Sequence, residues 1–188
     1  MKLDPRRAPE EVATPETVSA ASFDASGAAV IAGRTALWWS ADGAGPWARR
    51  PWPASPRSPS IAHAGEHAVV VDHGRGWVSA DTGETWARDP GLDDVTALSL
   101  VATDDGRVRV VAGRASGEVA HVETATLGAG GVTERWERLA RVSVAGDDDD
   151  GAPRVTAVRA LDPSAARVLA LTGRGELLLI VRRSALAR

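Results

Sequence analysis

The stretch of residues 74–86 limits what this chain can fold into more than any other, because it has the composition of a tight turn between two strands. Five of its residues carry the pattern: Ser79, Asp81, Gly83, Thr85 and Trp86. The aspartate can accept hydrogen bonds from backbone N–H groups just ahead of it, and the glycine can adopt a positive φ without a steric penalty. The serine and threonine can satisfy the remaining N–H groups of the turn, and the tryptophan enters the next strand as a buried anchor. All of these roles are structural, so the segment predicts a fold and not an activity.

A short apolar strand followed by Gly-Arg occurs four times along the chain. The four copies are Val30–Arg34, Val69–Arg75, Val110–Arg114 and Leu169–Arg174. Successive copies are about forty residues apart twice and about sixty residues apart once, which is typical of four-stranded propeller blades with one insertion. A second short strand of alternating polarity precedes each copy. We therefore predict an all-β fold, a β-propeller or partial propeller of about four four-stranded blades.

The repeats predict one propeller-like domain over residues 18–188. Its blades span approximately residues 18–55, 58–90, 94–142 and 153–188. Residues 1–17 are rich in proline and charge, and we expect them to form a tail or a segment that donates a strand. The last blade is expected to be incomplete, because only residues 182–188 follow its apolar third strand at 176–181.

Residues 74–86 match the pattern Ser-x-Asp-x-Gly-x-Thr-Trp and resemble the BNR/Asp-box repeat superfamily. With the apolar strand before them, they are similar to the photosystem II stability/assembly-factor type of propeller. A degenerate copy in the first unit keeps Ser40, Asp42 and Trp47 but changes the spacing. The resemblance implies a propeller with Asp-box hairpins. It implies no single activity, because sialidases, sortilin-type receptors and assembly factors share the motif. Complete propellers of this kind are larger than four blades.

The patterns that suggest catalysis or metal binding lack the context they need. Sialidases use a tyrosine nucleophile, and this chain contains no tyrosine. The run His63–His67 matches the zinc-binding pattern H-x-x-E-H, which requires a helix, but its glycine and its flanking strands predict a hairpin. Residues 147–151 are acidic but lack the glutamate of an EF-hand loop, so we expect a solvated loop. We predict no catalytic residue, no cofactor and no metal site.

The four Gly-Arg copies predict a cluster of guanidinium groups on one face near the propeller axis. The residues concerned are Arg34, Arg75, Arg114 and Arg174. Four such groups would form a face that binds an anion or an acidic partner. The alternative is that each arginine pairs with a neighbouring carboxylate or stacks on a tryptophan of its blade.

The composition narrows the choice of partners. The net charge of −3 favours neither nucleic acid nor an anionic membrane, and the absence of cysteine and of long apolar runs predicts a cytoplasmic protein. We therefore predict a noncatalytic protein-interaction or scaffold module of a cytosolic multiprotein assembly. The incomplete last blade would be covered by residues 1–17, by a second copy of the chain or by a protein partner. The alternative is a ligand-binding propeller for a carbohydrate or an anionic small molecule.

Overall fold

The computed structural model describes residues 13–55, 57–116, 119–128, 131–142 and 154–182. Within them the chain forms four antiparallel sheets in sequence order, each pairing only strands that are consecutive in the chain. The first sheet contains β1 (Val18–Phe23), β2 (Ala29–Gly33), β3 (Leu37–Ser40) and β4 (Ala48–Arg50). The second contains β5 (Ser60–Ala64), β6 (His67–Asp72), β7 (Arg75–Ser79) and β8 (Ala87–Arg88). The third contains β9 (Val95–Ala102), β10 (Val108–Ser116), β11 (Val119–Leu127) and β12 (Glu137–Val142). The fourth contains β13 (Val155–Ala160), β14 (Arg167–Thr172) and β15 (Leu177–Val181), and a short 3-10 helix (Pro90–Leu92) precedes the third sheet.

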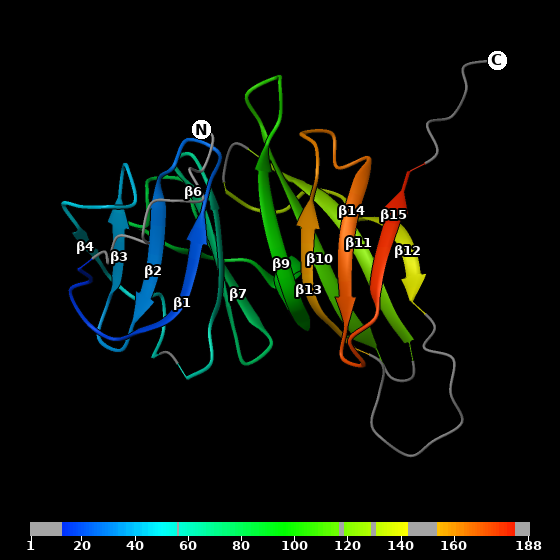
Figure 1. Ribbon diagram of the computed structural model, residues 1–188, viewed down its shortest axis with the longest axis horizontal. Coiled ribbons are helices and arrows are strands. Elements are labelled where there is room, and N and C mark those ends of the chain that lie inside the picture. The colour runs from blue at the N-terminus through cyan, green and yellow to red at the C-terminus, as the bar shows by residue number, and fades with distance from the viewer. Residues whose placement is uncertain (1–12, 56, 117–118, 129–130, 143–153, 183–188) are drawn as a thin grey trace, which may run out of the picture.

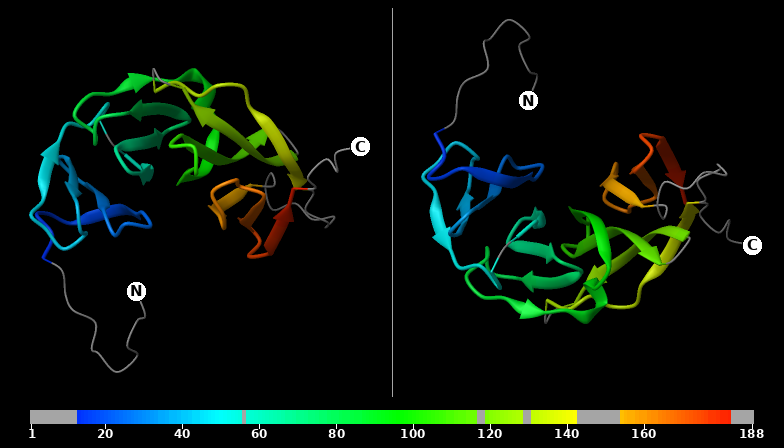
Figure 2. Two further views of the ribbon diagram at one scale, coloured as in Figure 1. Left: turned by 90° about the horizontal axis from the view of Figure 1, so that it is seen from above. Right: turned by 90° about the horizontal axis from the view of Figure 1, so that it is seen from below.

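These sheets are the four blades of a β-propeller, as predicted. The first strand of each blade lies innermost, and β1 packs on β5, β5 on β9 and β9 on β13. The described part of the fourth blade has three strands, which agrees with the expected incomplete last blade. No comparable packing joins the fourth blade to the first within the described residues. Figure 2 shows the result, an open arc with a gap between the first and the last blade.

Apolar layers between neighbouring blades hold the arc together. Because side chains alternate across a strand, each interior blade buries one face against the blade before it and the other against the blade after it. Val30 and Val70 belong to the layer between the first two blades. Val69 and Val110 belong to the next layer, and Val111 and Val168 belong to the layer between the third and fourth blades. Neighbouring valines such as Val69 and Val70 therefore serve opposite interfaces.

Three of the inner strands begin with the same irregularity. The triplets are Val18-Ser19-Ala20, Val95-Thr96-Ala97 and Val155-Thr156-Ala157, at the starts of β1, β9 and β13. In each, the pairing with the second strand shifts by one residue at the hydroxyl residue, as in a β-bulge. The hydroxyl then bonds to a carbonyl group of the second strand. The three triplets are structurally equivalent positions of three blades.

One Gly-Arg copy is not a turn, in contrast to the expectation. Gly113 and Arg114 lie inside β10, which continues to Ser116, whereas the other three copies lie at turns between the second and third strands. The register shift of β9 against β10 falls between these two residues. The same five-residue pattern therefore has two backbone conformations in this chain.

Candidate binding surfaces

The turn of the second blade has the hydrogen bonds expected from its sequence. The Asp81 carboxylate accepts the backbone N–H of Thr85 at 2.9 Å, and the Ser79 hydroxyl accepts the N–H of Gly83 at 2.8 Å. Gly83 has a φ of +82°, as predicted. The Thr85 hydroxyl donates to Asp81 at 2.5 Å instead of accepting a backbone N–H, which corrects its expected role. These contacts join one end of the turn to the other.

Burial raises the pKa of Asp81, but the hydrogen bonds from Thr85, Ser79 and Glu84 outweigh it and lower the pKa to about 2. The carboxylate therefore stays ionised over the whole neutral range. An anion held by its own turn has no proton to give or take near neutral pH. This geometry is that of a structural aspartate.

The degenerate copy in the first blade forms a similar turn. The Asp42 carboxylate accepts the hydroxyl of Ser40 at 3.0 Å and the N–H of Ala44 at 2.9 Å. Trp47 and Trp86, which follow the two turns, are half-buried, and so is Trp136 of the third blade. Trp86 and Trp136 pack against the apolar layers between blades, so the anchor expected of Trp86 is only partly buried. The remaining tryptophans are also half-buried, so the described residues contain no exposed tryptophan pair.

The four predicted arginines divide into two kinds. Arg34, Arg75 and Arg174 are exposed at turns between the second and third strands, which lie at one end of the propeller, the lower end in Figure 1. Arg114 is half-buried in β10 and makes structural contacts. Its guanidinium lies 4.4 Å from the Trp136 ring centre, and its Nε lies 3.0 Å from Oε2 of Glu123 in an ion pair that is not a directed hydrogen bond. It also donates to the carbonyl groups of Asp93 and Gly91. For Arg114 the structure shows the stacked and paired alternative, and the anion-binding face formed by the other three stays a prediction.

A cavity of about 600 Å³ lies beside Arg34, between the first and second blades. Its lining includes Arg34, Arg57 and Glu16. The Glu16 carboxylate accepts the indole N–H of Trp38 at 2.7 Å and the backbone N–H of Thr35 at 3.0 Å. Residues 13–17 of the predicted tail therefore lie against the first blade, while residues 1–12 are outside the described part of the chain.

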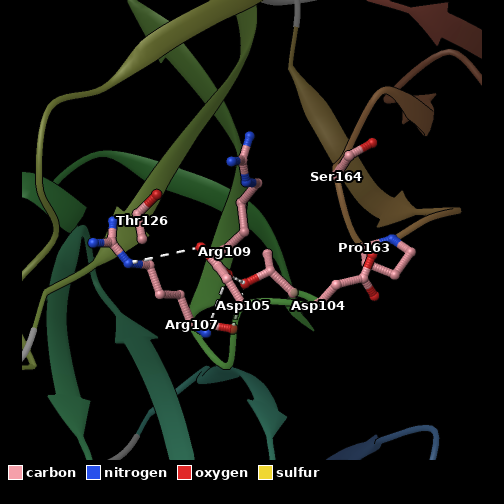
Figure 3. Close-up of a pocket in the computed structure, with 8 residues that line it drawn as sticks. Asp104, Asp105, Arg107, Arg109, Thr126, Pro163 and Ser164 are labelled. Atoms are coloured by element: carbon pink, nitrogen blue, oxygen red, sulfur yellow. Dashed lines mark hydrogen bonds and ion pairs between the residues drawn. The ribbon is translucent and has the colours of Figure 1, made fainter.

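A second cavity of about 300 Å³ opens at the opposite end, between the hairpins of the third and fourth blades (Figure 3). Figure 3 shows Arg109 extending from β10 between Thr126 and Ser164. Its Nε is buried and has no hydrogen-bond partner among the described residues. Arg109 is not among the site residues expected from the sequence. Its position between Val108 and Val110 in an alternating strand was the available signal, because the period of two places it on the face toward the fourth blade.

The H-x-x-E-H run forms a strand, a turn and a strand, as predicted. His63 is buried in β5 and His67 begins β6, so the two rings are not held together on a helix. No group of three or more potential metal ligands occurs in the described part of the chain. The acidic run at 147–151 lies outside it. Among the residues that the structure describes, no helix is long and apolar enough to cross a membrane.

The fourth blade exposes an apolar sheet face that points into the gap of the arc. Leu178 and Ile180 of β15 pack on the third blade, so the alternate residues lie on the opposite face. We call this opposite surface the open face; its apolar residues are Leu169, Leu171, Leu177, Leu179 and Val181. Arg159, which pairs with Leu169, and Arg167, which pairs with Val181, lie on the same face. Cross-strand pairing places Leu169 beside Leu179 and Leu171 beside Leu177. Leu177 and Leu179 have relative exposures of 67% and 59%, which is unusual for clustered leucines.

The first blade exposes apolar residues at the other end of the arc. Val18 and Phe23 of β1 have relative exposures of 37% and 59%. Val18 belongs to the bulge triplet, and the equivalent valines of the third and fourth blades, Val95 and Val155, are 5% and 0% exposed because a preceding blade covers them. The two ends of the arc thus carry the uncovered counterparts of interior blade surfaces.

Comparisons with known proteins support the fold. No family model matches the chain, and no curated protein matches its sequence. Among solved structures, the computationally designed Ika4 protein is similar, with a TM-score of 0.53 and 14% identity over 94% of this chain and 100% of that chain. YCF48 bound to a D1 peptide is also similar, with a TM-score of 0.51 and 16% identity over 94% of this chain and 56% of that chain. At these identities the likeness establishes the propeller fold alone.

Proposed function

We propose that this chain is a noncatalytic protein-interaction module of a cytosolic assembly, and that its Asp-box propeller is completed by blades that lie outside these 188 residues. The observation that carries the proposal is the open face on the fourth blade. Every interior blade of the arc has both faces covered, and the open face is the apolar equivalent of those covered surfaces. Burying an apolar surface of this kind against another polypeptide lowers the free energy of the system.

The strand edge supports the same conclusion. In the described residues β15 is the outermost strand of its sheet, so one row of its backbone N–H and C=O groups has no strand partner. Edge strands of this length and apolarity are usually covered in stable proteins. A partner that packs on the open face and pairs with β15 would satisfy both the apolar side chains and the backbone.

The electrostatics of the turns argue for a structural role of the Asp-box. Asp81 is ionised and held by its own turn, so it does not offer an acid or base to a substrate. Among the structural neighbours, YCF48 was solved with a peptide bound. A propeller of this general form binding a polypeptide is consistent with the proposed module.

The test uses charged substitutions on the open face. Leu177→Asp together with Leu179→Asp should abolish stoichiometric association, measured by native mass spectrometry of the chain purified from its own cells. The matched control is Val132→Asp, since Val132 is an exposed apolar residue of the third blade with a relative exposure of 45%. If the unmodified chain associates with nothing, or if the double variant associates as the unmodified chain does, the proposed interaction surface is wrong.

A further inference from the structure

We infer that the open face is covered by the first blade of a second copy of this chain, so that two chains related by a two-fold axis form one closed ring of eight blades. This inference rests on the proposed function and names the partner. It follows from the junction between the third and fourth blades, which shows how one bulge triplet docks on the preceding blade.

In that junction Thr96 connects the two blades. Its hydroxyl lies 2.7 Å from the carbonyl oxygen of Val155 and 3.2 Å from that of Gly113. The Val155 side chain fills the space beside Gly113, where an added Cβ would lie 2.6 Å from the Val155 Cβ. The first residue of one triplet therefore docks beside the hydroxyl residue of the triplet before it.

The fourth blade carries the hydroxyl that donates in such a junction, but no blade that would supply the accepting carbonyl group packs on it in the described residues. Thr156 is the equivalent of Thr96, and it is exposed. Its hydroxyl bonds to carbonyl groups of its own blade, those of Leu171 at 3.2 Å and Thr172 at 3.4 Å. Leu171 stands at the position of Gly113, because each pairs with the alanine of its triplet. The Leu171 side chain occupies the space that Val155 fills beside Gly113, so a valine docked on the fourth blade lies farther from its second strand. The junction surface is present, and its next blade is missing from the described residues.

The first blade offers the acceptor half. Val18 is the equivalent of Val155, and it is exposed where Val155 is fully buried. Docking β1 of a second copy on β13 would bring the Val18 carbonyl toward the Thr156 hydroxyl, and the Val18 side chain would pack on Leu171 at a wider spacing than Val155 has beside Gly113. The chain thus carries both halves of one junction at its two ends.

The shape of the arc selects a closed pair over other occupants. A contact between two different surfaces of one chain forms a ring when its rotation closes and a filament when it does not. Figure 2 shows the two ends of the arc facing the same open side, which is what a two-fold pair with two identical junctions requires.

Light scattering on the purified chain should give twice the mass of one chain. Val18→Asp and Leu171→Asp should each give a monomer, whereas Val132→Asp should remain a dimer. Thr156→Val keeps the shape of the side chain and removes its hydroxyl, so it should raise the dimer dissociation constant about fivefold per junction. Thr96→Val is the matched control, because it removes the same hydroxyl from a junction inside the chain and should lower the thermal midpoint without changing the mass.

Cysteine pairs test the geometry, since the chain has no cysteine of its own. Val18→Cys combined with Leu171→Cys should form covalent dimers under mild oxidation, and neither single variant nor a Val132→Cys/Leu171→Cys pair should do so. A ladder of larger covalent products would overturn the closed ring in favour of a filament. If the chain is a monomer that binds a different protein, and the Leu177→Asp/Leu179→Asp variant no longer binds that protein, this inference is overturned and the proposed function stands. A monomer with no such partner would overturn both.

Discussion

His63 and Ser22 join the first two blades through a shared oxygen: the backbone nitrogen and the Nδ1 atom of His63 each lie 3.1 Å from the Ser22 hydroxyl. The ring of His63 is buried, and its Nε2 lies 3.7 Å from the Asp24 carboxylate. The sequence had drawn attention to this histidine as half of a zinc motif. The structure gives it a role at a blade junction.

This junction predicts a pH dependence of stability. Burial lowers the pKa of His63, although the nearby Asp24 opposes the shift, so the folded state keeps the ring neutral below its usual pKa of about 6.5. Below that value the unfolded chain binds a proton that the folded chain does not, and the free energy of unfolding therefore falls as the pH is lowered. Urea titrations from about pH 8 to about pH 5 should show this loss, and His63→Gln should reduce it. The exposed His73, changed to Asn, should leave it intact.

The turn of the second blade predicts a stability effect without an effect on binding. Asp81→Ala removes the acceptor of the Thr85 N–H and hydroxyl, and should lower the free energy of unfolding by about 1–3 kcal/mol. Asp104→Ala is the control, because Asp104 is an exposed aspartate of another hairpin. Chemical denaturation measures both. A fully stable Asp81→Ala chain with impaired association would show that this aspartate belongs to a binding site.

The contacts of Arg114 predict that it cannot be substituted like a surface arginine. Arg114→Ala removes the cation from the Trp136 ring and from the largely buried Glu123 carboxylate, and should cost about 2–3 kcal/mol of stability. Arg75→Ala at an exposed turn should cost less than about 0.5 kcal/mol. Because Arg114 is structural, the predicted anion-binding face should be tested by reversing the charges of Arg34 and Arg75, which are both exposed. Equal midpoints for the two alanine variants would contradict the structural role of Arg114.

Close packing at Gly76 predicts a steric effect. An added Cβ there would lie 2.2 Å from the Leu92 Cβ, and Gly76 has an ordinary negative-φ backbone, so Gly76→Ala tests packing alone. We expect a loss of about 1–3 kcal/mol. Gly175→Ala is the comparison, because Gly175 has a φ of +82° and open space around it, and it should cost about 1 kcal/mol through backbone strain. Thermal unfolding of the two variants ranks the effects, and a smaller loss for Gly76→Ala would count against the described contact.

The sequence predicted the blades well because turn chemistry and repeat spacing are local. It could not predict which face of a strand meets which neighbour. The segments Val30–Arg34 and Val110–Arg114 differ in one residue, yet Val30 faces the following blade and Val110 faces the preceding one. With a side-chain period of two, a shift of one residue exchanges the two faces. The arginines that follow therefore occupy different environments, one in an exposed turn and one beside a tryptophan.

The open face shows a second limit on what can be predicted from the sequence. The sequence predicts an apolar strand at residues 176–181, and β15 spans Leu177–Val181. A strand apolar on both faces is typical of one covered on both sides. That pattern already distinguished β15 from a solvent-facing edge strand, but assigning its second face required the position of the third blade.

The strictly sequential pairing of the strands has a consequence for how the molecule comes apart. Within the described residues, substantial packing joins each blade only to its neighbours in sequence, so the chain behaves as a linear array and not as a closed cooperative unit. In such an array the ends fray first, and amide hydrogen exchange should be fastest in β15 and slowest in β6 and β10. Association across the gap would remove both ends at once, and the exchange gradient along the chain would then flatten.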